Sequence, residues 1–186
     1  MPPPEVQIAA AVLPLPAELR EAAAVRGYRA DAAELVPLRA GSNDMICLAD
    51  EPGNEVFHVA CYHASLEPFM ARGRALRAQG MERAAVDTVR FAEAESGALT
   101  LPAEPAALYS LTAPIADYDP AANSIRQAQP LYVLYTPWAT AESLGLTTKY
   151  TPGMPWVMSS GLPSSHIMIV PAKQDVPPDS SGLNRR

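Results

Sequence analysis

The sequence predicts an α+β fold in which a mostly antiparallel sheet, with a central β-hairpin, packs against a helical hairpin. Three observations support this prediction. Two strand-like stretches, residues 45–50 and 55–63, flank the turn-forming sequence EPGN. Two amphipathic stretches, residues 65–80 and 82–97, follow one another directly. The later strand-like stretches are separated by clusters of proline, glycine, asparagine and serine, and not by helices long enough for parallel crossovers.

The N-terminal part is expected to begin with helix and to continue as strands. Residues 5–25 predict two short helical pieces, interrupted at Pro14 and Pro16, because proline lacks a backbone donor and clashes inside a helix. The alternating stretches at 25–30 and 33–41 then predict a pair of strands.

The central hairpin of the sheet is expected at residues 45–63. Residues on both of its faces are largely apolar, so we expect it to be covered on both sides, with the helices on one of them.

The first helix of the expected helical hairpin starts near Ser65, which suits an N-cap, and ends at Gly80. The second helix follows almost at once, with Ala85, Val89 and Ala92 as its predicted buried stripe.

The C-terminal half predicts further strands and one long loop. Strands are expected at 105–114, 129–138, 155–160 and 166–171, and the polar residues 115–129 are expected to form an exposed loop. We expect a single domain over residues 1–172, followed by a disordered tail over 173–186.

Composition excludes several classes of function. The formal net charge of −6 gives no basic surface for nucleic acid or anionic lipid. No apolar stretch reaches the roughly 18 residues that a membrane-spanning helix requires. Phosphate-binding glycine loops, the dinucleotide fingerprint, HExxH, EF-hand and CxxC motifs are not found, so we expect no cofactor.

Both cysteines lie in the expected hairpin, within MICLADEPGNEVFHVACYH. The register that centres the turn on EPGN places Cys47 opposite Cys61, which predicts a disulfide. Such a bond would close a ring of 15 residues and stabilise the protein by about 3 kcal/mol in the chain-entropy model. The alternative is a pair of buried free thiols.

A zinc site is the third interpretation of the same stretch. Alternation along a strand puts Cys47, Cys61 and His63 on one face and His58 on the other. Three ligands without close spacing make a weak zinc motif, so we expect the protein to be free of metal.

The residues with potential for acid or base chemistry are scattered along the chain. His63 ends a strand just before a helix, and His166 starts the last expected strand, so either could serve as a general base assisted by Glu142 or Tyr135. Arg72 could then hold an anionic group. A half-buried histidine that bonds to the backbone is the simpler explanation of both.

An aromatic-rich region, residues 131–158, is the other candidate site. Rings mixed with polar groups suit a small-molecule pocket, although core packing would also explain them. Trp138 and Trp156 each follow a proline, which predicts extended backbone and rings at strand ends. The candidate ligand-binding residues are Tyr135, Thr136, Trp138, Trp156 and Arg72.

The segments GSNDMICLAD, HVACYHASLEPFMARGRALRAQG and PAALYSL resemble an uncharacterised family of exported bacterial proteins. The resemblance spans most of the chain, but it implies no activity and no site residue. The start of the chain lacks the basic and apolar regions of a signal peptide. Met1 before three prolines is typical of a processed mature domain, and with the expected disulfide it favours a secreted or periplasmic protein whose signal peptide has been removed. An intracellular origin is the alternative.

The favoured functional hypothesis is an exported domain that binds a small molecule or a protein partner through the aromatic-rich region. An enzyme with His63 or His166 as general base is the alternative, and a purely structural subunit is the third interpretation.

Overall fold

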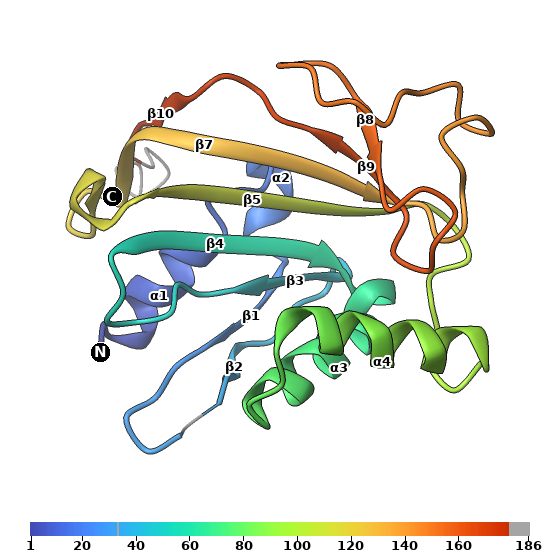
Figure 1. The fold of residues 1–186 in the computed structure, drawn as a ribbon. Coiled ribbons are helices and arrows are strands. Elements are labelled where there is room, and N and C mark those ends of the chain that lie inside the picture. Colours follow the sequence, from blue (N-terminus) through green and yellow to red (C-terminus); the bar gives the residue numbers. More distant parts are fainter. Residues whose placement is uncertain (33, 179–186) are drawn as a thin grey trace. The chain divides into compact units, whose positions relative to one another are not determined.

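The computed structural model describes residues 1–32 and 34–178 and has an α+β fold (Figure 1). Among these residues, four α-helices accompany a sheet of ten mostly antiparallel strands. Internal contacts divide the chain into two compact units, and the single domain expected from the sequence stays a prediction. Unit 1 contains Met1–Cys61, Tyr109–Leu131 and the described residues from Val170 onward, and unit 2 contains Tyr62–Leu108 and Tyr132–Ile169.

Unit 1 holds the N-terminal helices and most of the sheet. In chain order its elements are α1 (Pro4–Ala11), α2 (Ala17–Arg20), β1 (Ala24–Gly27), β2 (Val36–Arg39), β3 (Met45–Leu48), β4 (Val56–His63), β5 (Ala106–Pro114), the short helix η2 (Ile115–Asp117), β6 (Tyr118–Asp119), β7 (Ser124–Tyr135) and β10 (Gln174–Val176). Strands β4, β5 and β7 belong partly to each unit. The predicted break of the first helical segment at Pro14 and Pro16 is confirmed, because α1 ends before the first proline and α2 starts after the second.

The order of the strands in unit 1 is β2-β1-β3-β4-β5-β7, with β6 and β10 also paired to β7. The pair of strands expected after the helices is confirmed, since β1 and β2 are antiparallel. Strand β1 also runs parallel to β3, with Val25 beside Cys47. The hairpin strands β3 and β4 are neighbours, and the turn between them contains Gly53 at φ +94°.

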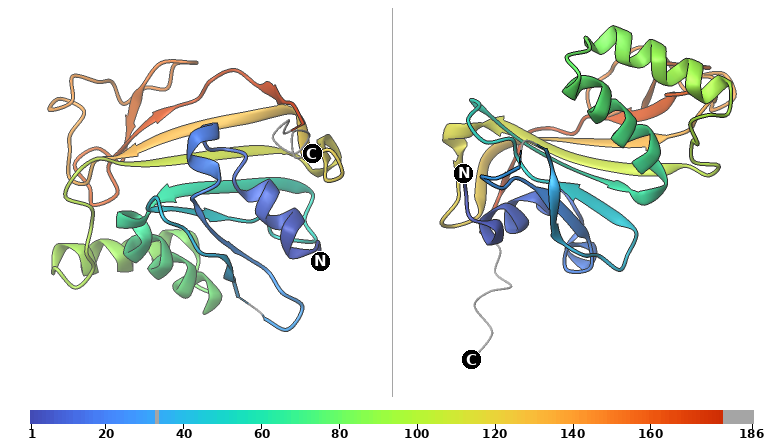
Figure 2. Two further views of the ribbon diagram at one scale, coloured as in Figure 1. Left: turned by 180° about the vertical axis from the view of Figure 1, so that it is seen from behind. Right: turned by 90° about the horizontal axis from the view of Figure 1, so that it is seen from below.

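Helix α1 and the turn that follows it pack on one face of the unit 1 strands (Figure 2). Ala11, Val12 and Leu15 form a buried cluster with residues of β1, β3 and β4 that includes Cys47 and Cys61. The opposite face of the hairpin is only partly covered, since His58 is exposed. The expectation that both faces are covered is therefore wrong at this position, and packing of the sheet on the helical hairpin stays a prediction.

The segment 115–129, which the sequence predicted as an exposed loop, contains structure. It forms η2, β6 and the first half of β7, and Ile125 and Ala128 are buried in the core. The polar residues Arg126 and Gln127 occupy exposed positions of the same strand. The loop prediction was wrong because alternation was interrupted by Gln127, whose backbone has a positive φ of 50°.

The C-terminal stretch 173–186, expected to be disordered, is described only as far as residue 178. Within it, Gln174–Val176 form β10 and pair with β7, and Val176 is part of the core. The remaining residues, 179–186, lie outside the described part of the chain.

Unit 2 contains the helical hairpin and the end of the sheet. Its own elements are the short helix η1 (Ala64–Leu66), α3 (Glu67–Ala78), α4 (Arg83–Glu95), β8 (Trp156–Met158) and β9 (His166–Ile169). Helices α3 and α4 pack on each other, and β9 pairs with both the end of β7 and β8. Gly80 follows the end of α3 at φ +81°, as the sequence predicted.

Two local details of the helices differ from expectation. Ser65 lies inside η1, and the N-cap of that helix is His63, whose Nδ1 accepts from the Ser65 backbone N–H at 3.3 Å. In α4 the buried residue is Val86, whereas Ala85 and Ala92 are exposed. The sequence could not predict which face of α4 is buried, because alanine occurs on several faces of the helix.

Candidate functional site

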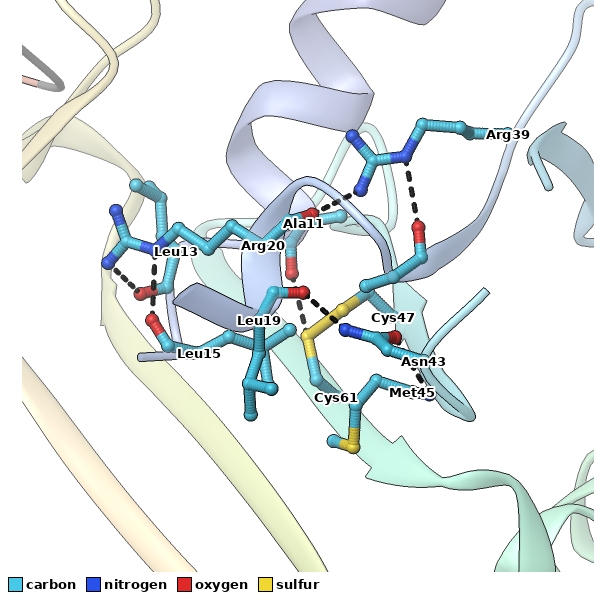
Figure 3. Close-up of a disulfide and its surroundings, with 11 residues drawn as sticks. Ala11, Leu13, Leu15, Leu19, Arg20, Arg39, Asn43, Met45, Cys47 and Cys61 are labelled. Carbon is cyan, nitrogen blue, oxygen red and sulfur yellow. Dashed lines mark hydrogen bonds between the residues drawn. A yellow bond between two sulfur atoms is a disulfide. The ribbon is translucent and has the colours of Figure 1, made fainter. Parts of the chain in front are cut away.

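Cys47 and Cys61 form a disulfide, so the prediction from the register of the hairpin is confirmed. Their Cα atoms are 4.0 Å apart, so the two residues lie side by side on the neighbouring strands β3 and β4. Both side chains are fully buried, and Cys61 Sγ lies 3.1 Å from the carbonyl oxygen of Ala11 (Figure 3). The bond is therefore covered by the end of α1.

The zinc interpretation conflicts with this bond, because the two sulfur atoms are joined to each other. Within the described ranges, no group of three or more histidine, cysteine, aspartate or glutamate side chains is arranged to hold a metal ion. No helix in the same ranges is long and apolar enough to cross a membrane.

The three candidate catalytic residues occupy different places in unit 2. His63 Nδ1 lies 2.8 Å from Ser65 Oγ at the start of η1. Glu142 is exposed in the loop that follows β7. His166 starts β9 opposite Tyr135, and its Nδ1 lies 2.6 Å from the carbonyl oxygen of Ser164.

The ring of His166 packs against an aromatic side chain. Its ring lies 5.0 Å from that of Tyr135, which in turn meets Phe69 edge-on at 6.4 Å. Burial lowers the pKa of His166, and the hydrogen bond to Ser164 opposes this only in part. Burial likewise raises the pKa of Tyr135.

Arg72 forms an ion pair with Glu93. Its Nε and Nη2 atoms donate to the carboxylate of Glu93 at 2.9 Å and 2.6 Å, so one edge of the guanidinium joins α3 to α4. Such a two-point contact between guanidinium and carboxylate is stronger than a hydrogen bond between neutral groups.

A pocket of about 580 Å³ lies within unit 2. One wall comes from the end of α4 and the segment that leads to β5, and the other from the loop after β7. The lining residues are Ala94, Leu99, Leu101, Pro102, Ala103, Glu104, Pro105, Thr136, Pro137, Trp138, Ala139 and Leu144. Thr136 and Trp138 are thus the candidate ligand-binding residues that line this pocket. Tyr135, Trp156, Arg72 and the three candidate catalytic residues do not line it.

Trp138 is held by an unusual turn. Ala139 N–H donates to the carbonyl of Thr136 at 3.0 Å, Pro137 is the second residue, and Trp138, the third, has φ +67°. This is the pattern of a type II turn, whose third position favours glycine. The prediction of extended backbone at Trp138 was wrong, because Pro137 restricts the residue before it and not the one after it.

The loop that carries Trp138 is tied to the segment before β9. Trp138 N–H donates to the Leu162 carbonyl at 3.0 Å, and Thr136 N–H donates to the Ser165 carbonyl at 2.9 Å. Ser165, which is fully buried, donates its hydroxyl to the Ala139 carbonyl at 2.6 Å. These bonds fix the backbone while the indole remains 46% exposed.

The other rings of the aromatic-rich region lie elsewhere. Tyr150 meets Trp156 edge-on at 6.0 Å, and the buried Trp156 Nε1 has no hydrogen-bond partner among the described residues. The segment 99–105, which forms one wall of the pocket, was not singled out from the sequence. Its leucines and prolines carry no polar signal that distinguishes a pocket wall from a linker.

Thr136 offers a prediction about stability. Its Oγ1 is buried and finds no hydrogen-bond partner in the described part of the chain. Because an unpaired buried hydroxyl is costly, Thr136→Val should raise the free energy of unfolding by about 1 kcal/mol. Urea denaturation measures this change.

Thr140→Val is the matched control in the same loop. Thr140 Oγ1 accepts from Ser143 N–H at 3.1 Å, so this replacement should lower the free energy of unfolding by about 0.5–1 kcal/mol. An equal decrease in the free energy of unfolding in both variants would contradict the assignment of Thr136 Oγ1 as unpaired.

Comparisons with protein-family models, curated proteins and solved structures found no match to this chain. The resemblance to exported bacterial proteins therefore stays a prediction.

Proposed function

We propose that this protein is an exported bacterial domain that binds a small molecule in the unit 2 pocket, with Trp138 as the main contact. The observation that carries the proposal is the conformation of Trp138. A bulky residue occupies a left-handed backbone position that glycine favours, and this residue lines the pocket and is 46% exposed.

Strain of this kind costs about 1–3 kcal/mol and concentrates at ligand-binding sites. Core packing does not explain it here, since a ring serving the core would be buried. The hydrogen bonds from Thr136, Trp138 and Ser165 hold the loop in one conformation, which reduces the entropy lost on binding.

The location proposed here is the periplasm or the cell exterior. The disulfide supports it, because such bonds persist in oxidising compartments. An enzyme remains the weaker candidate, since neither His63 nor His166 lines the pocket.

The proposal is tested by a thermal-shift screen of metabolites, followed by the variant Trp138→Gly. Compounds that bind the pocket should raise the melting temperature of the natural protein. We expect their affinity for Trp138→Gly to fall at least tenfold, because a central aromatic contact is lost.

Two further variants separate binding from folding. Trp138→Gly should be more stable than Trp138→Ala by about 1 kcal/mol, since glycine adopts the positive φ without strain. Tyr150→Ala, which removes an exposed ring outside the pocket lining, should leave affinity unchanged. Compounds that bind Trp138→Gly as tightly as they bind the natural protein would refute the proposed site. The proposal would also fail if the screen finds no binder and the protein instead captures a protein partner through another surface.

A further inference from the structure

The pocket lining carries one kind of charge. Of the twelve described residues that form it, Glu104 is the only ionisable one, and its side chain is exposed. No ion pair between Glu104 and a described residue is formed. A ligand in this pocket therefore meets a carboxylate and no lysine or arginine.

Helix α4 adds to the negative potential. Ala94, in its last turn, and Leu99, just after it, both line the pocket, so the pocket lies at the C-terminal end of the helix. That end carries the negative part of the helix dipole. The last turn of α4 contains no basic residue that would offset it, and the nearby Arg72 is already paired with Glu93.

The remaining walls suit an apolar body beside the charge. Leucine and proline supply half of the twelve lining residues, and the partly exposed Trp138 adds an aromatic ring. Indole faces attract cations through the ring quadrupole, more strongly than other aromatic rings do.

We propose that the ligand is an organic cation, an amine or quaternary ammonium group on an apolar or aromatic body. The charge of the ligand would lie near Glu104 and the end of α4, with its body against Trp138 and the prolines. This inference rests on the proposed binding function of the pocket, and it specifies the chemical class of the ligand.

Three probes of one size and different charge test the inference: benzylammonium, benzyl alcohol and benzoate. Titrations at low ionic strength, followed by indole fluorescence and by NMR shifts of residues lining the pocket, measure their affinities. We expect benzylammonium to bind about fivefold more tightly than benzyl alcohol, and benzoate to bind most weakly. Added salt should reduce the preference for the cation.

Glu104→Gln should reduce the preference for benzylammonium over benzyl alcohol to about twofold, because it removes the carboxylate that attracts the cation. Glu142→Gln is the matched control, because it removes the same charge from an exposed residue of unit 2 outside the lining. It should leave all three affinities unchanged, which separates a local contact from attraction by the overall charge of −6.

The outcomes distinguish this inference from the function on which it rests. Equal binding of the three probes, with all affinities lost in Trp138→Gly, would overturn the cation preference and retain the pocket. An equal effect of the two glutamate replacements would also overturn it. Failure of every probe to bind overturns the cation inference, and the metabolite screen then decides whether the pocket proposal fails with it.

Discussion

Replacing both cysteines, in Cys47→Ala/Cys61→Ala, should lower the free energy of unfolding by about 3 kcal/mol. The disulfide closes a ring of 15 residues, and its loss restores conformational freedom to the unfolded chain. The replaced side chains also belong to the buried cluster beneath α1, so a small packing loss adds to this effect. Urea denaturation with linear extrapolation measures the change.

The natural protein, unfolded and refolded in the presence of reductant, is the control. Its stability should match that of the double variant to within about 1 kcal/mol, since both lack the bond. Native protein should resist the same reductant, because the bond is buried against Ala11. Two reactive thiols in denatured, unreduced protein would contradict the disulfide itself.

Gln7→Leu should cost about 2–4 kcal/mol of stability. The side chain of Gln7, only 5% exposed, connects α1 to the end of β1 through the backbone of Tyr28. Its Nε2 donates to the Tyr28 carbonyl at 2.9 Å, and its Oε1 accepts from the Tyr28 N–H at 2.8 Å. A Cβ on Gly27 would approach Oε1 to 2.5 Å, so glycine leaves space for this amide.

Leucine fills a similar volume but removes three hydrogen bonds from a buried position, because Gln7 Nε2 also donates to the Pro2 carbonyl at 2.8 Å. Gln174→Leu, on an exposed position of β10, is the control and should change stability by less than about 0.5 kcal/mol. Because α1 covers the disulfide, Gln7→Leu should also make native protein more sensitive to reductant. Unchanged stability together with unchanged resistance to reductant would show that Gln7 does not secure α1.

The parts of the fold that sequence predicted best depend on neighbours in the chain. Pro14 and Pro16 divide the first helical segment because proline disfavours a helix interior. The EPGN turn sets the register of the hairpin, and this register places Cys47 opposite Cys61. Strand β10 could not be predicted in this way. Its partner lies almost fifty residues away, with Gln174 beside Ala128, and an isolated three-residue strand has no pattern of its own.

The candidate site was also predictable only where it depends on residues that are neighbours in the chain. Trp138 and Thr136 were singled out by local composition, and both line the pocket. The wall formed by residues 99–105 becomes part of it only through folding. The sequence prediction grouped three residues by their chemistry: His63, His166 and Glu142. The structure gives each of them different local contacts. Side-chain type alone could not predict this, because it carries no information on the distance between residues.

Unit 1 is built from three separate stretches of the chain, so its core can close only late in synthesis. Its core contains Phe57, Ile125 and Val176, so it stays incomplete while a ribosome is still translating the residues before β10. A nascent chain therefore has no finished unit 1 to release, and completion of the sheet follows translation of its last strand.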